Sequence, residues 1–371
     1  MKHCMDNIAM LFCELLQIAL GHSMEFSRVP SKEEWRELFL LAKKQALIGV
    51  SYVAIEKLPK NQKPPRKLYL QWGVTAEHIV KQNEELNIKA ISISKMFREA
   101  GFRNVVLKGQ GVALYYGIEN LNKYRMPGDV DIWLDGSRGD IVSYVCKCKP
   151  DCKIVYHHID FPEVEGVEVE VHFTPSWMNS YFTNRVLQRY FDQNKEWQFA
   201  QCEDEVEAIP VPSLAFNRVY ILVHIYRHLF HEGIGLRQLM DYYFVLRQGF
   251  TATERDYTMR ILRSLKMERF TSAVMWVLQE VLGLEDVYLL TSPNEKEGNF
   301  LLKEIIHSGN FGKSDKSLMR SRNESDLSYA IRKLRRNFRF IRSYPSEVLW
   351  SPLFKVWHYF WRNRMMKTKA A

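Results

Sequence analysis

Two aspartates that follow a Pro-Gly turn constrain this chain more than any other feature of its sequence. Asp129 and Asp131 lie in the stretch Arg125–Leu134, where apolar and acidic residues alternate from Val130 onward. The alternation predicts a β-strand that begins just after the turn. Side chains two positions apart on a strand point to the same face, so the two carboxylates are expected side by side. A divalent cation such as Mg²⁺ would relieve their repulsion, although an acidic strand end in solvent is an alternative interpretation.

A glycine-containing turn lies upstream of the two aspartates. Val105–Leu107 predicts a short buried strand, Gly109 and Gly111 permit a tight turn, and Val112–Tyr116 predicts a helix. Backbone N–H groups at such a turn, together with the positive charge of Lys108, suit a phosphate. The alternative is an ordinary strand-to-helix connection with glycines for packing, because the segment is neither a Walker A loop nor a dinucleotide-binding fingerprint.

A second acidic strand is expected downstream. Val167–Phe173 alternates strictly, so Glu168, Glu170 and His172 share one face and the valines share the other. If this strand joins the same sheet, it places a third carboxylate beside the aspartates. Three acids facing a phosphate-binding turn would form a two-metal site for phosphoryl transfer. The alternative is an edge strand whose polar face meets water.

The order of these segments resembles that of the DNA polymerase beta-like nucleotidyltransferase superfamily. More narrowly, the chain is similar to the bacterial "uncharacterised nucleotidyltransferase" family, which carries an L-K-G turn, an R-x-x-G-D-x-D strand and an E-x-H-aromatic strand. The matching residues are Leu107-Lys108-Gly109, Arg125 with Gly128-Asp129-Val130-Asp131, and Glu170-Val171-His172-Phe173. Two later helices of that family, one rich in histidine and one with an R…D pair, correspond to Leu222–His231 (His224, His228) and Leu236–Leu246 (Arg237, Asp241).

The resemblance implies an α+β fold in which a small mixed β-sheet carries the carboxylates, flanked by N-terminal and C-terminal helical regions. It also implies an enzyme that transfers a nucleoside monophosphate from an NTP such as ATP to an acceptor hydroxyl, with release of pyrophosphate. Mg²⁺ or Mn²⁺ would be the cofactor. The acceptor could be a protein, a small molecule or RNA.

The resemblance further implies roles for individual residues. Asp129, Asp131 and Glu170 would bind the metal, and Glu170 has the alternative role of accepting the proton of the acceptor hydroxyl. The nucleotide would be bound by Lys108, Gly109, Gln110, Arg125 and Gly128, with Arg125 either contacting the anion or fixing the turn. The residues expected to contact the acceptor or to support the site are His172, His224, His228, Arg237 and Asp241.

The turn of this chain departs from the superfamily pattern. Where relatives usually have Gly-Gly or Gly-Ser, this sequence has Gly109-Gln110, so a hydroxyl donor is missing, although the Gln110 amide can donate in its place. The departure favours an alternative function, a catalytically degenerate binding or scaffold protein whose basic C-terminal segment holds a polyanionic partner.

The chain is expected to have four regions. These are an N-terminal helical region (1–102), a catalytic sheet core (103–175), a helical domain (176–310) and a basic, aromatic-rich helical segment (311–371). A length of 371 residues with 46% hydrophobic content supports a sizeable core. No uninterrupted apolar run of about 20 residues occurs, so we expect a cytoplasmic protein without a transmembrane helix.

Cysteine and histidine residues leave two further alternatives. Cys146, Cys148 and Cys152 lie close to His157 and His158, which would suit zinc, but the spacing favours ordinary reduced cysteines. The side chains of the two helical histidines lie one turn apart, so they face the same way. They contact the nucleotide or acceptor, or are tied structurally to the R…D pair of the next helix.

Charge is concentrated in the C-terminal segment. Residues 311–371 hold fifteen Lys and Arg against four Asp and Glu, a net charge of +11, whereas the whole chain carries +9. Aromatic residues are interleaved with these cations. The pattern suits nucleic acid or an anionic membrane surface, and equally suits helices that pack on the body of the protein with their charges in solvent.

Overall fold

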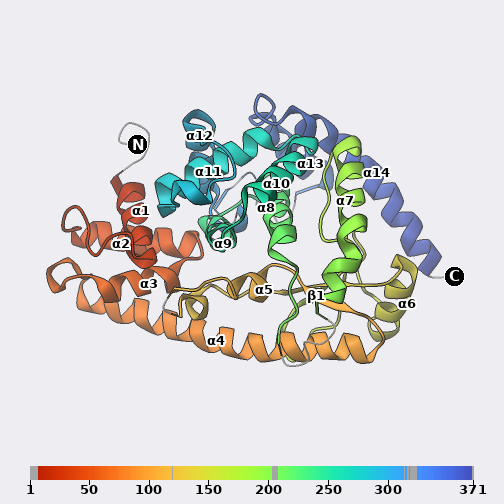
Figure 1. Cartoon of the computed structure of the whole chain (residues 1–371), viewed down its shortest axis with the longest axis horizontal. Helices are drawn as coiled ribbons and strands as arrows, with labels where there is room; N and C mark the ends of the chain where they lie inside the picture. The colour runs from red at the N-terminus through yellow and green to blue at the C-terminus, as the bar shows by residue number, and fades with distance from the viewer. Residues whose placement is uncertain are drawn as a thin grey trace.

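The computed structural model describes residues 7–118, 120–202, 208–312, 314, 315, 317 and 324–369. Four helices precede the sheet: α1 (Asn7–Leu20), α2 (Lys32–Lys44), α3 (Ile48–Lys57) and α4 (Arg66–Glu99), with a 3₁₀ turn, η1 (Lys60–Gln62). Ser31 starts α2 with a capping box, in which its side chain accepts a hydrogen bond from the backbone of Glu34 and the Glu34 side chain accepts one from the Ser31 backbone. Helix α4, with 34 residues, runs along the lower edge of the molecule (Figure 1).

A small mixed sheet follows. Its strands are β1 (Asn104–Val106), β2 (Val130–Leu134), β3 (His158–Asp160) and β4 (Val169–His172), in the order β1-β2-β4-β3. β2 runs parallel to β4, whereas β1 and β3 are antiparallel to their neighbours. The connections contain α5 (Gly109–Ala113), η2 (Leu121–Tyr124) and α6 (Arg138–Cys148). The expected α+β class is therefore confirmed.

The two faces of the sheet have different chemistry because side chains alternate along each strand. One face is apolar: Ile132, Ile159 and Val171 pack in a core that includes Phe97 of α4 and Ile141 of α6. The opposite face carries Asp131, Glu170 and His172, together with Trp133, as the strand register requires. Sequence alternation therefore sends every acid of the sheet to the side away from α4.

Helices of the second half of the chain cover the polar face. They are α7 (Tyr181–Ala200), α8 (Leu214–His231), α9 (Leu236–Arg247), α10 (Ala252–Ser264), α11 (Glu268–Leu282), α12 (Glu295–Ser308), α13 (Asp326–Phe338) and α14 (Pro345–Lys369), with the 3₁₀ turns η3 (Asp286–Tyr288) and η4 (Asn310–Gly312). Trp133 contacts Phe199 of α7 at 4.8 Å between ring centroids and stacks on Phe216 of α8 at 5.7 Å. This aromatic cluster anchors α7 and α8 above the sheet (Figure 1).

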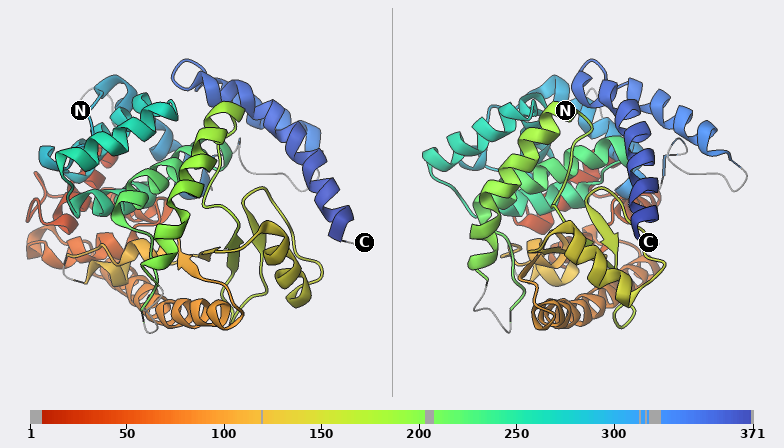
Figure 2. Two further views of the ribbon diagram at one scale, coloured as in Figure 1. Left: turned by 45° about the vertical axis from the view of Figure 1, so that its right-hand side comes forward. Right: turned by 90° about the vertical axis from the view of Figure 1, so that its right-hand side faces the viewer.

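The N-terminal and C-terminal helices share one hydrophobic core. Phe12 of α1 and Trp35 of α2 belong to the same buried cluster as Met240 of α9 and Trp276 of α11. The C-terminal helix α14 joins that core near its start, through Val348, and then extends alongside the part of the molecule that contains α6 (Figure 2). No helix among the described residues has both the length and the apolar character needed to cross a membrane.

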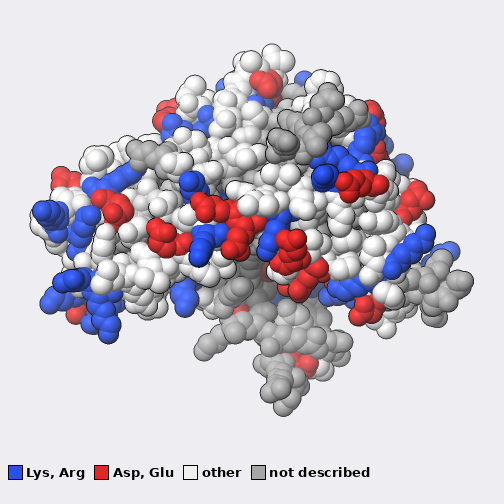
Figure 3. Space-filling view, turned by 90° about the horizontal axis from the view of Figure 1, so that it is seen from below, with Lys and Arg blue, Asp and Glu red and all other residues white. Residues whose placement is uncertain are grey.

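The surface that contains α4 carries charges of both signs. Viewed from below, Lys and Arg side chains are interspersed with Asp and Glu rather than forming a field of one sign (Figure 3). This matches the charged outer face expected for the long helix, whose inner face buries Trp72, Ile79, Leu86 and Phe97.

One local expectation was wrong. The helix predicted over 112–116 is instead α5, which begins at Gly109 and ends at Ala113. The chain turns there because Tyr116 points inward, where its hydroxyl donates to Asp241 Oδ1 at 2.6 Å. Ser213 caps the start of α8, since its side chain accepts a hydrogen bond from the backbone N–H of Phe216.

Candidate active site

Strands β2 and β4 bring two carboxylates together at the centre of the sheet. Asp131 is the direct partner of Glu170 in the parallel register, so both side chains leave the same face from adjacent strands. The Asp131 side chain is 2% exposed and the Glu170 side chain is 31% exposed. One acid is therefore buried at the base of the site and the other stands at its opening.

His172 links the two acids. Its Nε2 lies 2.8 Å from Asp131 Oδ1 and 3.6 Å from Glu170 Oε2. Burial by itself would lower the pKa of His172, but the hydrogen bonds to Asp131 and Glu170 outweigh burial and raise that pKa. Burial likewise opposes ionisation of Glu170, yet His172 and the charge of Lys108 bring the pKa of Glu170 down to about 2. The site thus keeps Glu170 in its anionic form.

Lys108 approaches the same carboxylate from the turn after β1. Its Nζ lies 2.8 Å from Asp131 Oδ1. Burial opposes the charged amine, but the charges of Asp131 and Asp129 raise the pKa of Lys108 above its ordinary value. Gly109 follows with a φ of +52°, a conformation that favours glycine. Because α5 has only five residues, its helix dipole is short, and the positive charge at this turn is that of Lys108.

Asp129 lies at the rim of the site. It precedes the first residue of β2, so the alternation rule does not place it on the face that carries Asp131. Asp129 lines a small cavity with Asp131 and a larger one, of about 860 Å³, with Glu170. The structure brings Asp131, Glu170 and His172 into one cluster and holds Asp129 next to it.

The clustered side chains fit a divalent cation. Ligand atoms of Asp131, Glu170 and His172 all lie within 4.8 Å of one another. His157, His158 and His172 form a second such group, so imidazoles and carboxylates adjoin. Two carboxylates with one imidazole suit Mn²⁺ and other borderline ions as well as Mg²⁺, because nitrogen ligands are disfavoured only by the hardest cations. His172 has a buried Nδ1 for which no partner occurs among the described residues.

The Arg125 side chain is held in a buried ion pair. Its guanidinium, 4% exposed, forms a two-pronged ion pair with Asp241 at 2.7 and 2.8 Å. Asp241 also accepts from the Tyr116 hydroxyl. The backbone of the same loop is held from the other side by Asn83 of α4, which donates to the carbonyls of Lys123 and Arg125. Of the two roles expected for Arg125, the contacts favour fixing the turn that carries Asp129.

Gln110 points away from the cavities. Its amide donates to Asn87 Oδ1 at 2.6 Å and to Asn83 Oδ1 at 3.4 Å, and its side chain is buried against α4. The amide donor expected to replace the missing hydroxyl of the turn is therefore engaged elsewhere. Gly128 lines both cavities, next to Asp129.

The helical histidines occupy different surroundings from those expected. His228 pairs with Glu232 at 3.0 Å and accepts from Arg227 at 3.1 Å, so the expected tie to Arg237 or Asp241 was wrong for this residue. The reason is that α8 itself supplies the closest charges. His224 lines the small cavity beside Lys108, and burial lowers its pKa well below the ordinary value. Arg237 donates to the carbonyl of Met126 and so helps to fix the loop before Asp129.

Several residues at the site were not singled out for it by the sequence. His158 Nδ1 lies 3.2 Å from Glu170 Oε2, and Arg227 donates to His157 Nε2 at 3.1 Å. Lys43 and Lys44 of α2 line the larger cavity from the far N-terminal region. The alternation of His158-Ile159-Asp160 is typical of a strand. Because cysteines lie nearby in the sequence, His157 and His158 were interpreted as possible zinc ligands instead. The Sγ atoms of Cys146 and Cys152 lie 3.3 Å apart without a disulfide bond, whereas Cys148 is exposed.

Comparison with known proteins agrees with this geometry. A family model described as uncharacterised nucleotidyltransferase matches residues 31–283, which include every strand of the sheet and the helices α8 and α9. Searches of curated proteins and of solved structures gave no significant match. The family expected from the sequence motifs is thereby confirmed, and the chain belongs to the uncharacterised nucleotidyltransferase family.

Proposed function

We propose that the protein is a metal-dependent nucleotidyltransferase that moves a nucleoside monophosphate from an NTP to an acceptor hydroxyl. One observation carries the proposal: Asp131 and Glu170 are register partners on adjacent parallel strands, with Lys108 2.8 Å from Asp131. This arrangement offers anionic ligands and a phosphate-binding cation at one point. Membership of a nucleotidyltransferase family supports the same reaction class.

Each group has a distinct task in the proposed reaction. The acceptor oxygen attacks the α-phosphorus, the bond from that phosphorus to the β-phosphate oxygen breaks, and pyrophosphate leaves. Asp131 and Glu170, with Asp129 at the rim, would hold one or two divalent cations, which neutralise charge on the triphosphate. Lys108 and the Gly109 turn would hold the leaving phosphates. The hydroxyl proton passes to Glu170 or to water.

Neutral and cationic groups around the acids support this assignment. Lys108 and His172 compensate Asp131 in the absence of a cation. With a cation bound, His172 would be a ligand of that cation instead of a hydrogen-bond partner of Asp131. Lys108 would then be available to contact a phosphate. The buried network of Arg125, Asp241 and Tyr116 keeps the loop that carries Asp129 in place.

The function is tested by label transfer. The protein is incubated with each α-³²P-labelled NTP, Mg²⁺ or Mn²⁺, and a cell lysate as the source of acceptors. We expect label on an acceptor with the unaltered protein and a loss of at least about 100-fold in the Asp129→Ala/Asp131→Ala variant, the scale of losing electrostatic stabilisation of a transition state. The exposed Glu99→Gln variant serves as the control. Equal labelling by the double variant would contradict the proposal.

A binding or scaffold function is the second candidate. The observation that favours it is the engagement of the Gln110 amide by Asn83 and Asn87, which removes one expected phosphate donor. Under this alternative, the protein would bind a non-hydrolysable ATP analogue in a titration but would label no acceptor with any NTP or metal.

A further inference from the structure

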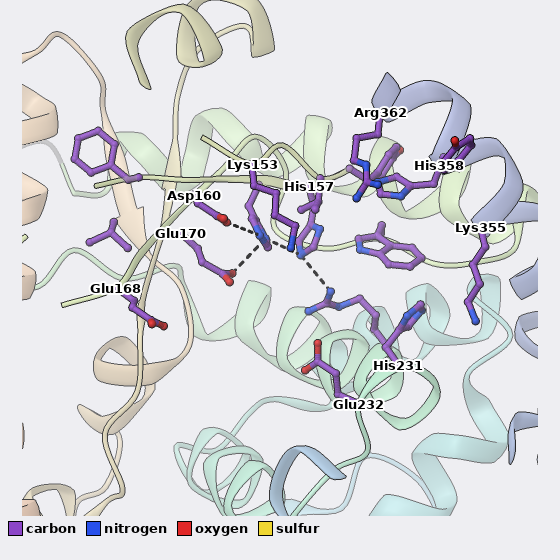
Figure 4. A pocket seen from close by; sticks show the side chains of 18 of the residues that line it. Lys153, His157, Asp160, Glu168, Glu170, His231, Glu232, Lys355, His358 and Arg362 are labelled. Carbon is purple, nitrogen blue, oxygen red and sulfur yellow. Dashed lines mark hydrogen bonds and ion pairs between the residues drawn. The ribbon is translucent and has the colours of Figure 1, made fainter. Parts of the chain in front are cut away.

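A second large cavity opens on the other side of Glu170. It has a volume of about 760 Å³ and lies between β3, the end of α8 and the inner face of α14. Figure 4 shows Asp160, Glu168 and Glu170 on one side of this cavity and Lys355, His358 and Arg362 of α14 on the other. No substrate of the proposed reaction has been assigned to this cavity, and its role rests on the proposed function.

The two large cavities meet at the carboxylates. Both are lined by Glu170 and His158, and both are lined by Arg227 and Glu232 of α8. Lys108 lines the first cavity, the one of about 860 Å³ described above, together with Lys43 and Lys44 of α2. Lys108 does not line the second cavity. The triphosphate therefore belongs in the first cavity. An in-line displacement needs the attacking oxygen on the side of the phosphorus opposite the leaving group, and the second cavity reaches Glu170 without being lined by Lys108.

Flat aromatic surfaces form part of the wall of the second cavity. Trp177 stacks on Phe354 of α14, with ring centroids 4.2 Å apart and planes 12° from parallel. Tyr156 contacts both rings, at 6.3 and 5.9 Å. Such rings bury an apolar or ring-shaped part of a ligand, and the volume lies in the range of small-molecule sites.

Unpaired cations form another part of the wall. Lys355 and Arg362 of α14 line the cavity, as do Lys149 and Lys153. Among the described residues, none of these four side chains forms an ion pair. Burial lowers the pKa of Lys355 and, with the nearby charge of Lys355, lowers the pKa of Lys333 to about 8. Lys355 is thus a partly buried cation, and such a charge is costly unless an anion compensates it.

We propose that the second cavity is the acceptor site, and that it takes a small hydroxyl compound carrying a phosphate monoester. The phosphate lies against Lys355 and Arg362, the carbon skeleton lies on Trp177 and Phe354, and the hydroxyl points toward Glu170. Asp160, Glu168 and Glu170 lie on the opposite side of the cavity, so on the α14 side a dianion matches Lys355 and Arg362 better than a neutral sugar or an uncharged side chain does.

The binding test uses phenyl phosphate as the probe and phenol as its uncharged counterpart. Isothermal titration of the full chain is expected to detect phenyl phosphate binding and no phenol binding at the same concentration. The Lys355→Met/Arg362→Met variant should weaken phenyl phosphate binding at least tenfold. The matched control, Lys43→Met/Lys44→Met, removes two lysines from the donor cavity and should change this affinity less than twofold.

The two variants show which of the two cavities binds phenyl phosphate. Loss of binding in the Lys43/Lys44 variant alone would place the probe in the donor cavity and overturn the proposal, as would no binding by the unaltered protein. Because methionine keeps the apolar stem and removes uncompensated charge, the Lys355→Met/Arg362→Met variant should melt no lower than the unaltered protein, so weak binding cannot be ascribed to unfolding.

Label transfer separates this proposal from the proposed function. If the lysate assay labels an acceptor equally well with the unaltered protein and the Lys355→Met/Arg362→Met variant, the enzyme stands and the acceptor site is wrong. If phenyl phosphate binds as expected but no NTP labels any acceptor, the cavity is an anion site and the transferase proposal fails.

Discussion

Asp131 is the residue on which the site is centred, because it receives both Lys108 and His172 on one oxygen at 2.8 Å. These contacts give a buried carboxylate two nitrogen partners without an added ion. A divalent cation would compete with both contacts. The affinity of the site for a cation therefore depends on whether the cation stabilises Asp131 and Glu170 better than the Lys108 amine and the His172 imidazole do.

Arg125 gives a prediction at the same scale. Changing Arg125 to Ala leaves Asp241 buried without its ion-pair partner, and removing one member of a buried pair costs about 3–5 kcal/mol. We expect urea unfolding to show a loss of that size. Arg255→Ala, at an exposed arginine with a 3.6 Å ion pair, should change the free energy of unfolding by less than about 0.5 kcal/mol. Unaltered stability with only weaker NTP binding would instead assign Arg125 to the nucleotide.

Residues also show what the sequence could and could not predict. Alternation in β2 and β4 was sufficient to place Asp131, Glu170 and His172 on one face, because that rule is local. It could not place Asp129, which precedes the strand, nor the Gln110 amide, whose partners lie on α4. Lys43 escaped notice and His157 was considered only for zinc, because their contribution to this site depends on helix and strand packing between distant segments.

Among the elements, the turn from β1 to α5 is closely packed at Gly111. A Cβ at Gly111 would lie 2.7 Å from the carbonyl oxygen of Val106 and 3.0 Å from Cγ1 of Val211. Backbone and a packed side chain cannot both yield without moving the turn. The glycines here therefore serve close packing as well as any phosphate contact, so both interpretations of the motif apply.

Gly111→Ala is accordingly expected to destabilise the protein by about 1–3 kcal/mol, the usual cost of overpacking. The displaced turn should also reduce label transfer, since Lys108 lies three residues before it. Gly117→Ala is the matched control, because nothing lies within 4 Å of a Cβ there. Denaturant unfolding of both variants gives the comparison. Equal stability of the two would show that the turn accommodates a side chain.

Helix α14 is attached to α7 through a buried acid. Glu347 accepts hydrogen bonds from the backbone N–H groups of Asn179, at 2.7 Å, and Ser180, at 3.2 Å, just before α7. Burial raises the pKa of Glu347 to about 7 in spite of these donors. The folded state therefore holds a proton on Glu347 more strongly than the unfolded chain does. This contribution to stability is fully present below the ordinary carboxyl pKa and is lost as the pH rises through about 7.

The Glu347→Gln variant tests this linkage, because glutamine resembles the protonated acid in shape and cannot ionise. The free energy of unfolding of the unaltered protein, minus that of the variant, should fall by about 2 kcal/mol between pH 5 and pH 8. Chemical denaturation at several pH values provides the measurement. A difference that stays constant over this range would mean that Glu347 is already ionised throughout it.

At the scale of the whole molecule, the sheet is a thin layer between α4 and the later helices, and the site forms where these parts meet (Figure 1). Periodicity predicted the strands that carry the acids, and the resemblance to the family implied the α+β class. They did not predict that helices from both ends of the chain share a core, or that α2 and α14 line cavities beside the sheet, because such contacts depend on three-dimensional packing. The four regions expected from the sequence remain a prediction about domain boundaries.

The central claim is that Asp131 and Glu170 together hold a divalent cation. Titration of Mn²⁺ followed by electron paramagnetic resonance, with a non-hydrolysable ATP analogue present, tests it directly. We expect bound Mn²⁺ with the unaltered protein and with the surface variant Glu99→Gln, and at least tenfold weaker binding in both Asp131→Asn and Glu170→Gln. Mn²⁺ binding of equal strength in all four proteins, or no binding in any, would contradict the account.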